Sequence, residues 1–537
     1  MSETKPTRSL AGIAGVIAVA TLLSKIFGLV REQVIAAAFG VGPAVNAFAY
    51  AYVVPGFLLI LLGGINGPFH SALLSVLSRR DRDRAALVET VTTVVTGFLL
   101  LVAVVLFIFA PFCIDAIAPG LQEIPNGEQV RAIAIEQLRL MTPLAVLAGW
   151  IGIGFGTLNA ANLYWLPGIS PLFSSLTVIG GISILALVVG DRIVEPEIAR
   201  IGGLVLAGGT LLGAVWQWAV QAIAQWRSGM GGLRFRLALR DPGVREVLGI
   251  MLPATMSSGT FQINTFVDLS FASYIASAAA VMKYASLVVL TPVGVLSNAI
   301  LVPFLPVFSR LIAPEQRGEL KERIRQGLVL SALTMLPFTA IIATIPTPIV
   351  RVVYERGIWD PEATRLVAPV LVAYGLGMFF YLARDVLVRV FYAFGDGATP
   401  LKVSVVNIVL NIVLDYVMVS VLDLGARGLV YATVGVNIIS IAVFLTLLHR
   451  RLQGLPLGKW SFTLLQLLGA TTLSAGGCWG MQWLWEHVLG DENFLLLLGE
   501  VSVSAIVALG IFALTLVPLQ LPEVELLTVR IRKRLGR

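Results

Sequence analysis

The chain has 537 residues, of which 57% are hydrophobic and only 13% are charged, with a formal net charge of +7. A soluble globular domain carries roughly 25% charged residues, and the mean hydropathy of this chain is +0.89. These values exclude a soluble enzyme, a disordered chain and a small disulfide-bonded secreted domain.

Apolar stretches long enough to cross a bilayer of about 30 Å recur along the chain, and each crossing helix needs about 20 residues. We therefore predict an all-α polytopic membrane protein with 14 transmembrane helices. The first stretch is too long for a cleavable signal peptide. The predicted spans are residues 10–38, 44–66, 86–112, 132–157, 169–190, 201–226, 245–274, 284–307, 328–350, 366–393, 400–421, 426–448, 461–486 and 494–518.

Lys and Arg concentrate in the loops that would share one side of the membrane with both termini, such as residues 79–84, 227–245 and 310–325. The positive-inside rule then predicts that both termini are cytoplasmic. The basic tail RIRKRLGR indicates an anchor near anionic membrane lipids rather than a nucleic-acid partner.

Residue patterns typical of cofactors and metals are missing from the sequence. Cys113 and Cys478 lie in or beside apolar segments, and the 3 His have no zinc-type spacing. No GxxxxGK[ST] loop is found, which argues against an ATP-driven pump. We expect no metal and no cofactor.

Two proline-containing spans resemble one another. Pro55 lies in the second span with Pro68 just after it, Pro292 and Pro303 lie in the eighth span, and a Ser-Arg pair follows each segment. Interrupted helices at matching places indicate two halves around a central site, although proline is common in membrane helices. We predict an N-lobe (1–227), a C-lobe (228–452), and two extra helices with a basic cytoplasmic tail (453–537).

Charged residues at bilayer depth cost at least about 2.5–3.5 kcal/mol, so they are candidates for function. Lys25 lies near the middle of the first span, and Glu32 lies seven residues later, on the same helix face. With Arg31, they form a cationic patch suited to a phosphate. The alternative is that Arg31 and Glu32 reach the outer interface.

A second cluster joins Asp268 in the seventh span to a polar face of the eleventh span. Asn407, Asn411 and Asp415 repeat every four residues, so they share one helix face. Carboxylate and amide oxygens, with the Thr433 hydroxyl, suit Na⁺ or H⁺. The cluster is either a coupling-ion site or a set of interhelical hydrogen bonds.

A third group lies in the tenth span. Arg384, Asp385 and Arg389 precede the motif FYAFGDGATP. They indicate a cytoplasmic gate or head-group contact, or an interfacial anchor, which is slightly favoured.

Several motifs resemble the lipid II flippase family MurJ, also called MviN. They are SKIFGLVREQVIAAAFGVGPAVNAFAYAYVVP, SSGTFQINTFVDLSFAS, the Arg356-Gly357 pair and the FYA..D..TP run that starts at Phe391. The resemblance covers roughly residues 8–450, and the last two helices match only in length and hydropathy.

The resemblance implies the fold of the multidrug/oligosaccharidyl-lipid/polysaccharide exporter superfamily, with two six-helix lobes around a central cavity and two C-terminal helices. It implies a transporter, not an enzyme, in a bacterial inner membrane. Its cargo would be undecaprenyl-pyrophosphate-linked peptidoglycan precursor (lipid II), carried to the outer leaflet for cell wall biogenesis and cell shape. Lys25 takes the place of a family Arg, Arg31 matches another, and Glu32 and Asn46 stand at acidic positions.

This chain departs from the family where Leu59 and Leu287 replace arginines, so Lys283 is the nearest cation in the eighth span. The predicted substrate-binding residues are Lys25, Arg31, Glu32, Asn46, Lys283 and Arg389. The predicted coupling-ion residues are Asp268, Asn411, Asp415 and Thr433.

We predict a monomeric flippase that works by alternating access and is driven by Na⁺, H⁺ or the membrane potential, worth about 2.3 kcal/mol per charge per 100 mV. The polar head would cross through protein while the lipid tail stays in the bilayer. The first alternative is an exporter of another lipid-linked polysaccharide unit or of drugs. A membrane-embedded glycan enzyme and a non-transporting scaffold rank lower, because the loops are short.

Overall fold

The computed structural model describes residues 10–64, 67–80, 82–190, 196–238, 240–259, 263–490 and 493–524. Within these ranges the chain is almost entirely helical and forms no strand. It divides into two compact units, the first comprising residues 1–280 with 357–359 and the second comprising 281–356 with 360–537. The lobe boundary predicted near residue 227 stays a prediction.

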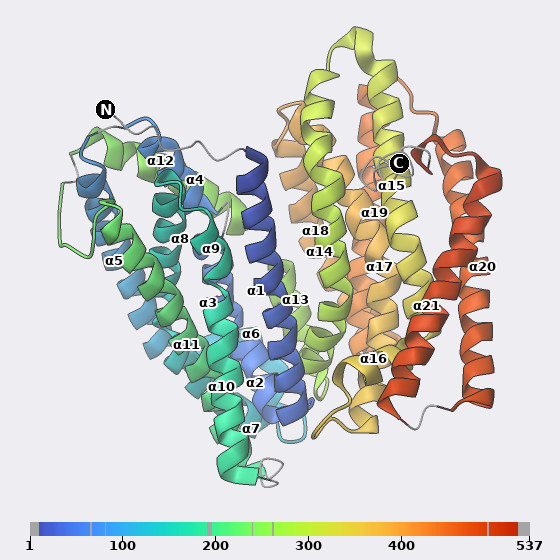
Figure 1. The fold of residues 1–537 in the computed structure, drawn as a ribbon, viewed down its shortest axis with the longest axis horizontal. Helices are drawn as coiled ribbons and strands as arrows, with labels where there is room; N and C mark the ends of the chain where they lie inside the picture. The colour runs from blue at the N-terminus through green and yellow to red at the C-terminus, as the bar shows by residue number, and fades with distance from the viewer. Residues whose placement is uncertain are drawn as a thin grey trace. The chain divides into compact units, whose positions relative to one another are not determined.

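The first unit contains the helices up to residue 280 (Figure 1). They are α1 (Leu10–Phe39), α2 (Pro43–Ala51), α3 (Val53–Gly63), α4 (Pro68–Leu77), α5 (Arg84–Ile108), α6 (Ala110–Ile117), the 3₁₀-helix η1 (Pro119–Gln122), α7 (Gly127–Met141), α8 (Leu144–Ala160), α9 (Trp165–Ile169), α10 (Leu172–Val189), α11 (Pro196–Arg227), α12 (Pro242–Gly259) and α13 (Ile263–Ala272).

The second unit contains the remaining helices, although the first three residues of α14 belong to the first unit. They are α14 (Ala278–Arg310), η4 (Pro314–Gln316), α15 (Arg317–Thr344), α16 (Pro346–Tyr354), α17 (Pro361–Ala393), α18 (Ala398–Tyr416), the π-helical η5 (Val417–Val421), α19 (Gly425–Arg451), α20 (Leu457–Val488), α21 (Phe494–Leu516) and η6 (Val517–Leu519).

All fourteen predicted spans coincide with one helix or a consecutive pair, which confirms the all-α membrane class. By length and composition, ten helices in the described part could cross a membrane, or eleven with the bent α7–α8 pair. The other predicted spans are α1, the α12–α13 pair and α20, whose Gly, Ser and Thr residues lower its hydropathy.

Only one of the two predicted helix interruptions is found. The second span contains α2 and α3, and Pro68 starts the next helix, α4, at a position where the missing N–H of proline costs nothing. In contrast, α14 continues past Pro292 and Pro303 to Arg310. A membrane helix tolerates proline when neighbouring groups satisfy the freed carbonyls, so proline spacing alone does not predict a break.

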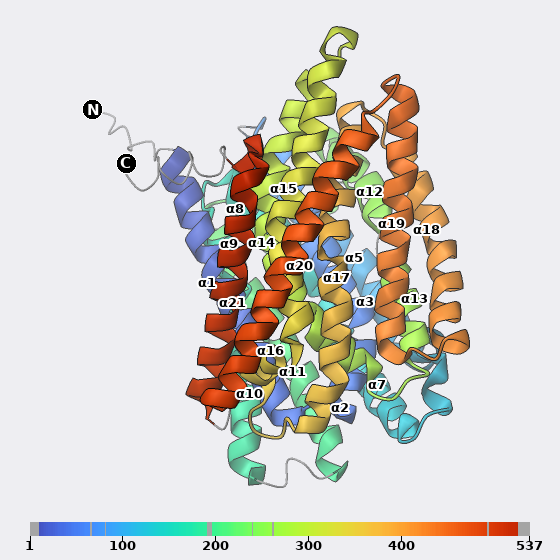
Figure 2. The same ribbon diagram turned by 90° about the vertical axis from the view of Figure 1, so that its right-hand side faces the viewer.

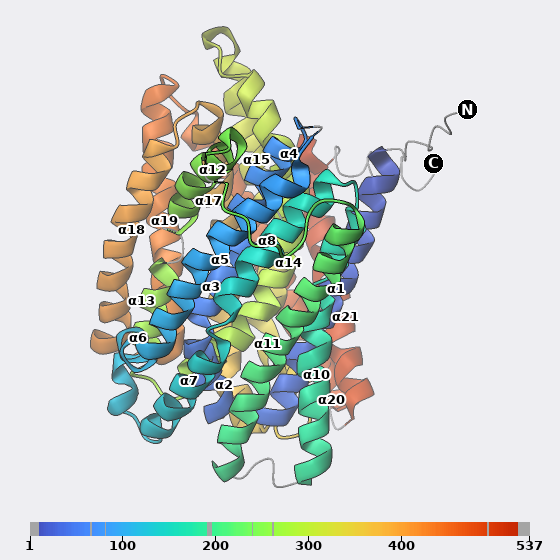
Figure 3. The same ribbon diagram turned by 90° about the vertical axis from the view of Figure 1, so that its left-hand side faces the viewer.

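The core of the first unit surrounds α8. Helices α3, α4 and α5 pack against it, and Figure 3 shows α5, α8 and α11 side by side. Close approach depends on glycine, because a Cβ on Gly152 would lie only 1.9 Å from the Leu62 carbonyl oxygen. Small residues at helix contacts are the main packing device in membranes, where lipid removes the hydrophobic drive.

The core of the second unit forms around α15. Helices α17, α20 and α21 pack on it (Figure 2), and the core cluster joins Leu333, Leu467 and Phe512. Helix α17 begins at a proline, and its N-cap residue Asp360 accepts a 2.7 Å hydrogen bond from the Ala363 N–H. This cap satisfies an N–H that has no partner within the helix.

Candidate functional site

The charged patch of α1 contains a tight ion pair and an exposed lysine. The Arg31 guanidinium donates from Nη2 and Nε to Glu32 Oε1, at 2.7 and 3.1 Å. The side chain of Arg31 is 31% exposed and that of Glu32 only 6%. Lys25, six residues earlier, is exposed. An anion could therefore meet two cations here: the Arg31 guanidinium, partly neutralised by Glu32, and the exposed Lys25 ammonium group.

Gly28 lies between these two cations. A Cβ built on it would have no atom within 4 Å. There is open space beside α1 at this level, so a ligand could approach the helix closely.

Asn46 is a structural anchor in this structure. It is buried, and its Nδ2 donates to the carbonyl oxygens of Val41 at 2.8 Å and Gly42 at 3.3 Å. Its Oδ1 accepts from the Ala280 N–H at 3.1 Å, in the first turn of α14. The side chain therefore joins the α1–α2 turn to a helix 234 residues away, and its role in substrate binding stays a prediction.

Asp268 and the polar face of the eleventh span lie in different units. Asp268 is half-buried on α13 in the first unit, whereas Asn411, Asp415 and Thr433 lie in the second. We therefore describe them separately, and their common role in ion coupling stays a prediction.

The polar residues of α18 share one buried face. Asn411 and Asp415 are fully buried, and Asn411 Nδ2 donates to Asp415 Oδ2 at 2.5 Å. Asn407 Oδ1 accepts from the Ser440 hydroxyl of α19 at 3.0 Å. The opposite face is exposed and apolar, as at Val409. Carboxylate, amide and hydroxyl oxygens are hard ligands, which suit Na⁺ or a proton rather than a soft metal.

Thr433 and its neighbours lie on α19, which packs against α18. The Thr433 hydroxyl donates to the Leu429 carbonyl at 3.2 Å, and Asn437 Nδ2 donates to the Thr433 carbonyl at 2.7 Å. No cluster of three His, Cys, Asp or Glu residues that could hold a metal ion is found in the described ranges.

The remaining predicted cations also lie in the second unit. Lys283 Nζ lies 5.8 Å from the ring centre of Tyr284, whose carbonyl accepts from the Tyr354 hydroxyl at 3.0 Å. Arg389 is half-buried on α17, and Asp385 on the same helix is exposed. Their substrate contacts stay predictions.

Leucine stands at the two positions where the resemblance implies arginine. Leu59 packs against the core of the first unit, and Leu287 is half-buried on α14. Neither position offers a cation.

Sequence reasoning missed the ion pairs between loops, because it used those arginines only to assign topology. Arg80 Nη2 lies 2.7 Å from Asp241 Oδ1, and Arg79 Nη2 lies 3.1 Å from Glu246 Oε1. The hydrogen bond from Arg80 holds the pKa of Asp241 below its ordinary value. The sequence signal for these pairs was the presence of opposite charges after α4 and around the start of α12. The two ion pairs connect the end of α4 to the start of α12.

The FYA..D..TP run forms a similar junction in the second unit. Asp396 accepts from the backbone N–H and hydroxyl of Thr399, at 3.0 and 2.9 Å, and from Arg451 Nη1 at 2.9 Å. The Thr399 N–H bond is the main cause that lowers the pKa of Asp396. Phe391 packs on Phe444, with ring centres 5.3 Å apart. The motif thus joins α17, α18 and α19.

Comparison with known proteins gives a consistent result. A family model described as "Lipid II flippase MurJ" matches residues 35–498. The chain is 54% identical over 534 residues to the probable lipid II flippase MurJ of Synechocystis sp., with 99% of each chain covered. It is 28% identical over 466 residues to the lipid II flippase MurJ of Burkholderia cenocepacia, covering 85% of this chain and 87% of that protein.

Solved structures share the fold. A lipid II flippase MurJ in an inward closed conformation matches with a TM-score of 0.72 at 21% identity, covering 94% of this chain and 99% of that one. An inward-facing multidrug resistance MATE family transporter of the MOP superfamily matches at 0.59 with 17% identity, covering 82% and 98%.

Proposed function

The chain belongs to the lipid II flippase MurJ family, and from that premise we propose that it moves lipid II from the inner to the outer leaflet of a bacterial inner membrane. The observation that carries this proposal is 54% identity along the whole length of a probable flippase. It is a multi-pass membrane transporter, and its cargo is a membrane lipid with a large anionic head.

The α1 patch would bind the pyrophosphate of this cargo. Lys25 is exposed and Arg31 keeps part of its guanidinium accessible beside Glu32. Charge-assisted hydrogen bonds from such groups to phosphate oxygens are roughly twice as strong as neutral ones. A protein-lined path spares the sugars and phosphates a transfer into hydrocarbon, while the undecaprenyl tail remains in lipid.

Energy would come from ion coupling at the buried face of α18 or from the membrane potential. Asn411 and Asp415 are fully buried and in contact, so binding or release of Na⁺ or H⁺ there would change the charge inside the bundle. The test is precursor exposure measured across a series of Na⁺ concentrations and pH values for wild type and Asp415→Asn. Loss of ion dependence in the variant supports coupling, and unchanged dependence refutes it.

Precursor exposure in depleted cells tests the main proposal. An external enzyme that cleaves only outward-facing lipid II reports the fraction that has crossed. Depletion should trap precursor inside, and wild type should restore exposure, whereas Lys25→Ala/Arg31→Ala should not. Arg365→Ala is the matched control, because its side chain is 78% exposed and outside the patch.

The outcomes separate the alternatives. If precursor remains exposed after depletion, peptidoglycan lipid is not the cargo, and another lipid-linked polysaccharide or a drug takes its place. If the double variant restores exposure as well as wild type does, α1 does not hold the head group.

Orientation and assembly are further parts of the proposal. The distribution of Lys and Arg supports cytoplasmic termini. Labelling of single cysteines placed near residue 8 and near residue 525, with a reagent that does not cross membranes, would refute this orientation if it occurred in intact cells. The monomeric state stays a prediction.

A further inference from the structure

Tyr52, at the junction of α2 and α3, is a polar side chain that the proposed function does not yet use. It follows the last residue of α2 and precedes the first residue of α3, and its backbone N–H donates to the Phe48 carbonyl at 2.9 Å. Its own carbonyl accepts from the Gly56 N–H at 2.7 Å. Hydrogen bonds to both helices therefore hold the backbone at this position.

The ring of Tyr52 is also held in place. It stacks on the Phe48 ring, with ring centres 5.2 Å apart and an angle of 12° between the two planes. It lies against Gly56 as well, where a Cβ would be only 2.5 Å from Tyr52 Cε1, so the glycine makes room for the ring. A side chain that is already ordered can bind a ligand with little further loss of conformational entropy.

The hydroxyl of this fixed ring is available to a ligand. It makes no hydrogen bond to any residue in the described ranges. Tyr52 is half-buried, and its oxygen is not one of the buried atoms, so it keeps accessible surface. A tyrosine hydroxyl in a largely apolar setting usually finds a hydrogen-bond partner. This one can therefore donate to a group that the chain itself does not supply.

The charges that act on this hydroxyl belong to the α1 patch. Tyr52 interacts electrostatically with both Arg31 and Glu32. Arg31 uses Nε and Nη2 for Glu32, and its Nη1 makes no hydrogen bond within the described ranges. Gly28, three residues earlier on the same helix face, has no atom within 4 Å of a Cβ built on it. An anion beside this face has room to meet a guanidinium donor and a hydroxyl donor together.

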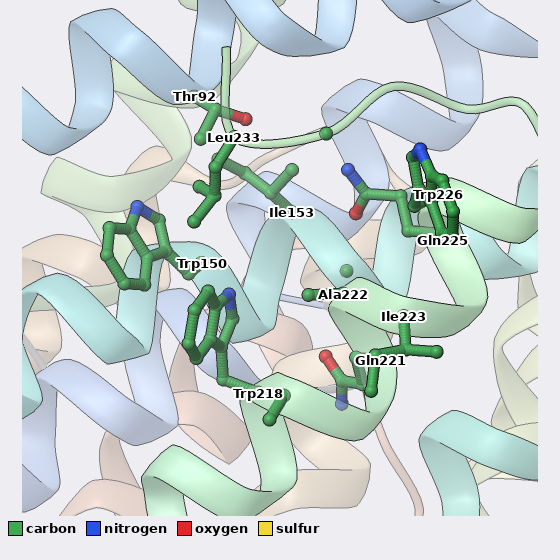
Figure 4. A pocket seen from close by; sticks show the side chains of 13 residues that line it. Thr92, Trp150, Ile153, Trp218, Gln221, Ala222, Ile223, Gln225, Trp226 and Leu233 are labelled. Atoms are coloured by element: carbon green, nitrogen blue, oxygen red, sulfur yellow. The ribbon is translucent and has the colours of Figure 1, made fainter.

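The larger hollow of the first unit does not compete for such an anion. It has a volume of ≈ 360 Å³ and lies between α5, α8 and α11, where Trp150 and Trp218 form one wall (Figure 4). None of the described residues that line it is charged. A phosphate placed there would lose its hydration and gain no cation in return, which is costly. The α1 patch with Tyr52 offers both a charge and a hydroxyl.

We propose that Tyr52 is a further head-group residue of this transporter, and that its hydroxyl donates to a phosphate oxygen of the lipid-linked diphosphate that Arg31 binds. This inference rests on the proposed function and names one more contact of the same site.

The contact compensates for two weaknesses of the patch. Glu32 neutralises part of the Arg31 charge, and Leu59, seven residues after Tyr52, offers no donor where the resemblance implies arginine. A hydrogen bond from a neutral hydroxyl to a charged phosphate oxygen is charge-assisted, and such bonds are roughly twice as strong as bonds between neutral groups. Tyr52 thus adds affinity for phosphate without adding another buried charge.

Native mass spectrometry of the purified full-length protein tests this contact. The protein would be titrated with undecaprenyl pyrophosphate and with undecaprenol, which keeps the lipid tail but has no phosphate. Tyr52→Phe keeps the ring on Phe48 and Gly56 and removes only the hydroxyl. It should weaken binding of undecaprenyl pyrophosphate about tenfold, the contribution of one hydrogen bond to a charged group. It should leave the affinity for undecaprenol unchanged.

Tyr50→Phe is the matched control, because Tyr50 is a buried tyrosine on α2 on which neither Arg31 nor Glu32 acts. It should leave both affinities unchanged. In an Arg31→Ala background, Tyr52→Phe should have a smaller effect than in wild type, because two groups that hold the same phosphate are coupled.

The outcomes separate this contact from the proposed function. If wild type binds undecaprenyl pyrophosphate no better than undecaprenol, diphosphate recognition itself is refuted, and the proposed cargo with it. If Arg31→Ala loses the preference for the diphosphate and Tyr52→Phe keeps it in full, only the role of Tyr52 is overturned. An equal loss in Tyr50→Phe, or an equal effect of Tyr52→Phe in both backgrounds, also overturns it.

Discussion

Substitution of Gly357 by alanine should destabilise the first unit more than its backbone angle alone would. Gly357 has a φ of +62°, and a Cβ there would lie 2.3 Å from the carbonyl oxygen of Ala37, near the end of α1. The next residue, Ile358, donates its N–H to that same oxygen at 2.8 Å. The carbonyl cannot move away from a methyl group without weakening this hydrogen bond.

The magnitude follows from two costs. A left-handed conformation costs an alanine about 1–2 kcal/mol, and loss of a backbone hydrogen bond costs about 0.5–1.5 kcal/mol. Gly357→Ala should therefore lower the free energy of unfolding by about 2–3 kcal/mol.

Gly229→Ala is the matched control. Gly229 has a φ of +70°, but a Cβ there would have no atom within 4 Å. Gly229→Ala should therefore lower the free energy of unfolding only by the cost of the left-handed backbone conformation. The assay is the unfolding midpoint in detergent, followed by near-ultraviolet circular dichroism. Equal shifts for the two variants would refute the contribution of the Ala37 contact.

Three further substitutions test contacts between distant parts of the chain. Arg325→Met should lower the free energy of unfolding by about 3–5 kcal/mol, because the fully buried Glu523, 2.6 Å away, would lose its cation. The unfolding midpoint measures this loss. Asp396→Asn should lower the unfolding midpoint at pH 7 and should flatten the dependence of that midpoint on pH. A carboxylate whose pKa is lowered on folding stabilises the folded protein above its ordinary pKa of about 3.9, and this contribution is lost as the pH falls through the folded pKa. Asn46→Ala should cost about 1–3 kcal/mol, since it leaves a buried N–H without an acceptor; both the midpoint and precursor exposure should be measured.

Each of these predictions has a contrary outcome. Arg323→Met removes an exposed pair with Glu319 and should change stability by less than about 1 kcal/mol, so an equal effect at Arg325 would contradict the burial argument. A wild-type pH profile retained by Asp396→Asn would assign the titration to another group. A loss of precursor exposure by Asn46→Ala at an unchanged midpoint would make Asn46 a substrate contact instead of an anchor.

The predicted arrangement of side chains is found where the residues lie on one helix, although their role stays a prediction. Asn407, Asn411 and Asp415 share a buried face of α18, as a four-residue repeat requires. The sequence placed Lys25 and Glu32 on one face of the first span, but the structure pairs Glu32 with Arg31. Helix geometry determines which residues share a face, and side-chain conformation decides which of them pair.

The sequence by itself determined the all-helical membrane class, the positions of the spans and the family. These depend on hydropathy and motifs, which are properties of short stretches of chain. Tertiary structure alone decided which distant groups meet: Asn46 with the start of α14, Asp396 with Arg451, and Gln221 with Ser170. Hydrogen bonds and steric clashes form or disappear when two atoms move by a few tenths of an ångström. The distance between two such atoms depends on how whole helices pack, and no local sequence pattern encodes it.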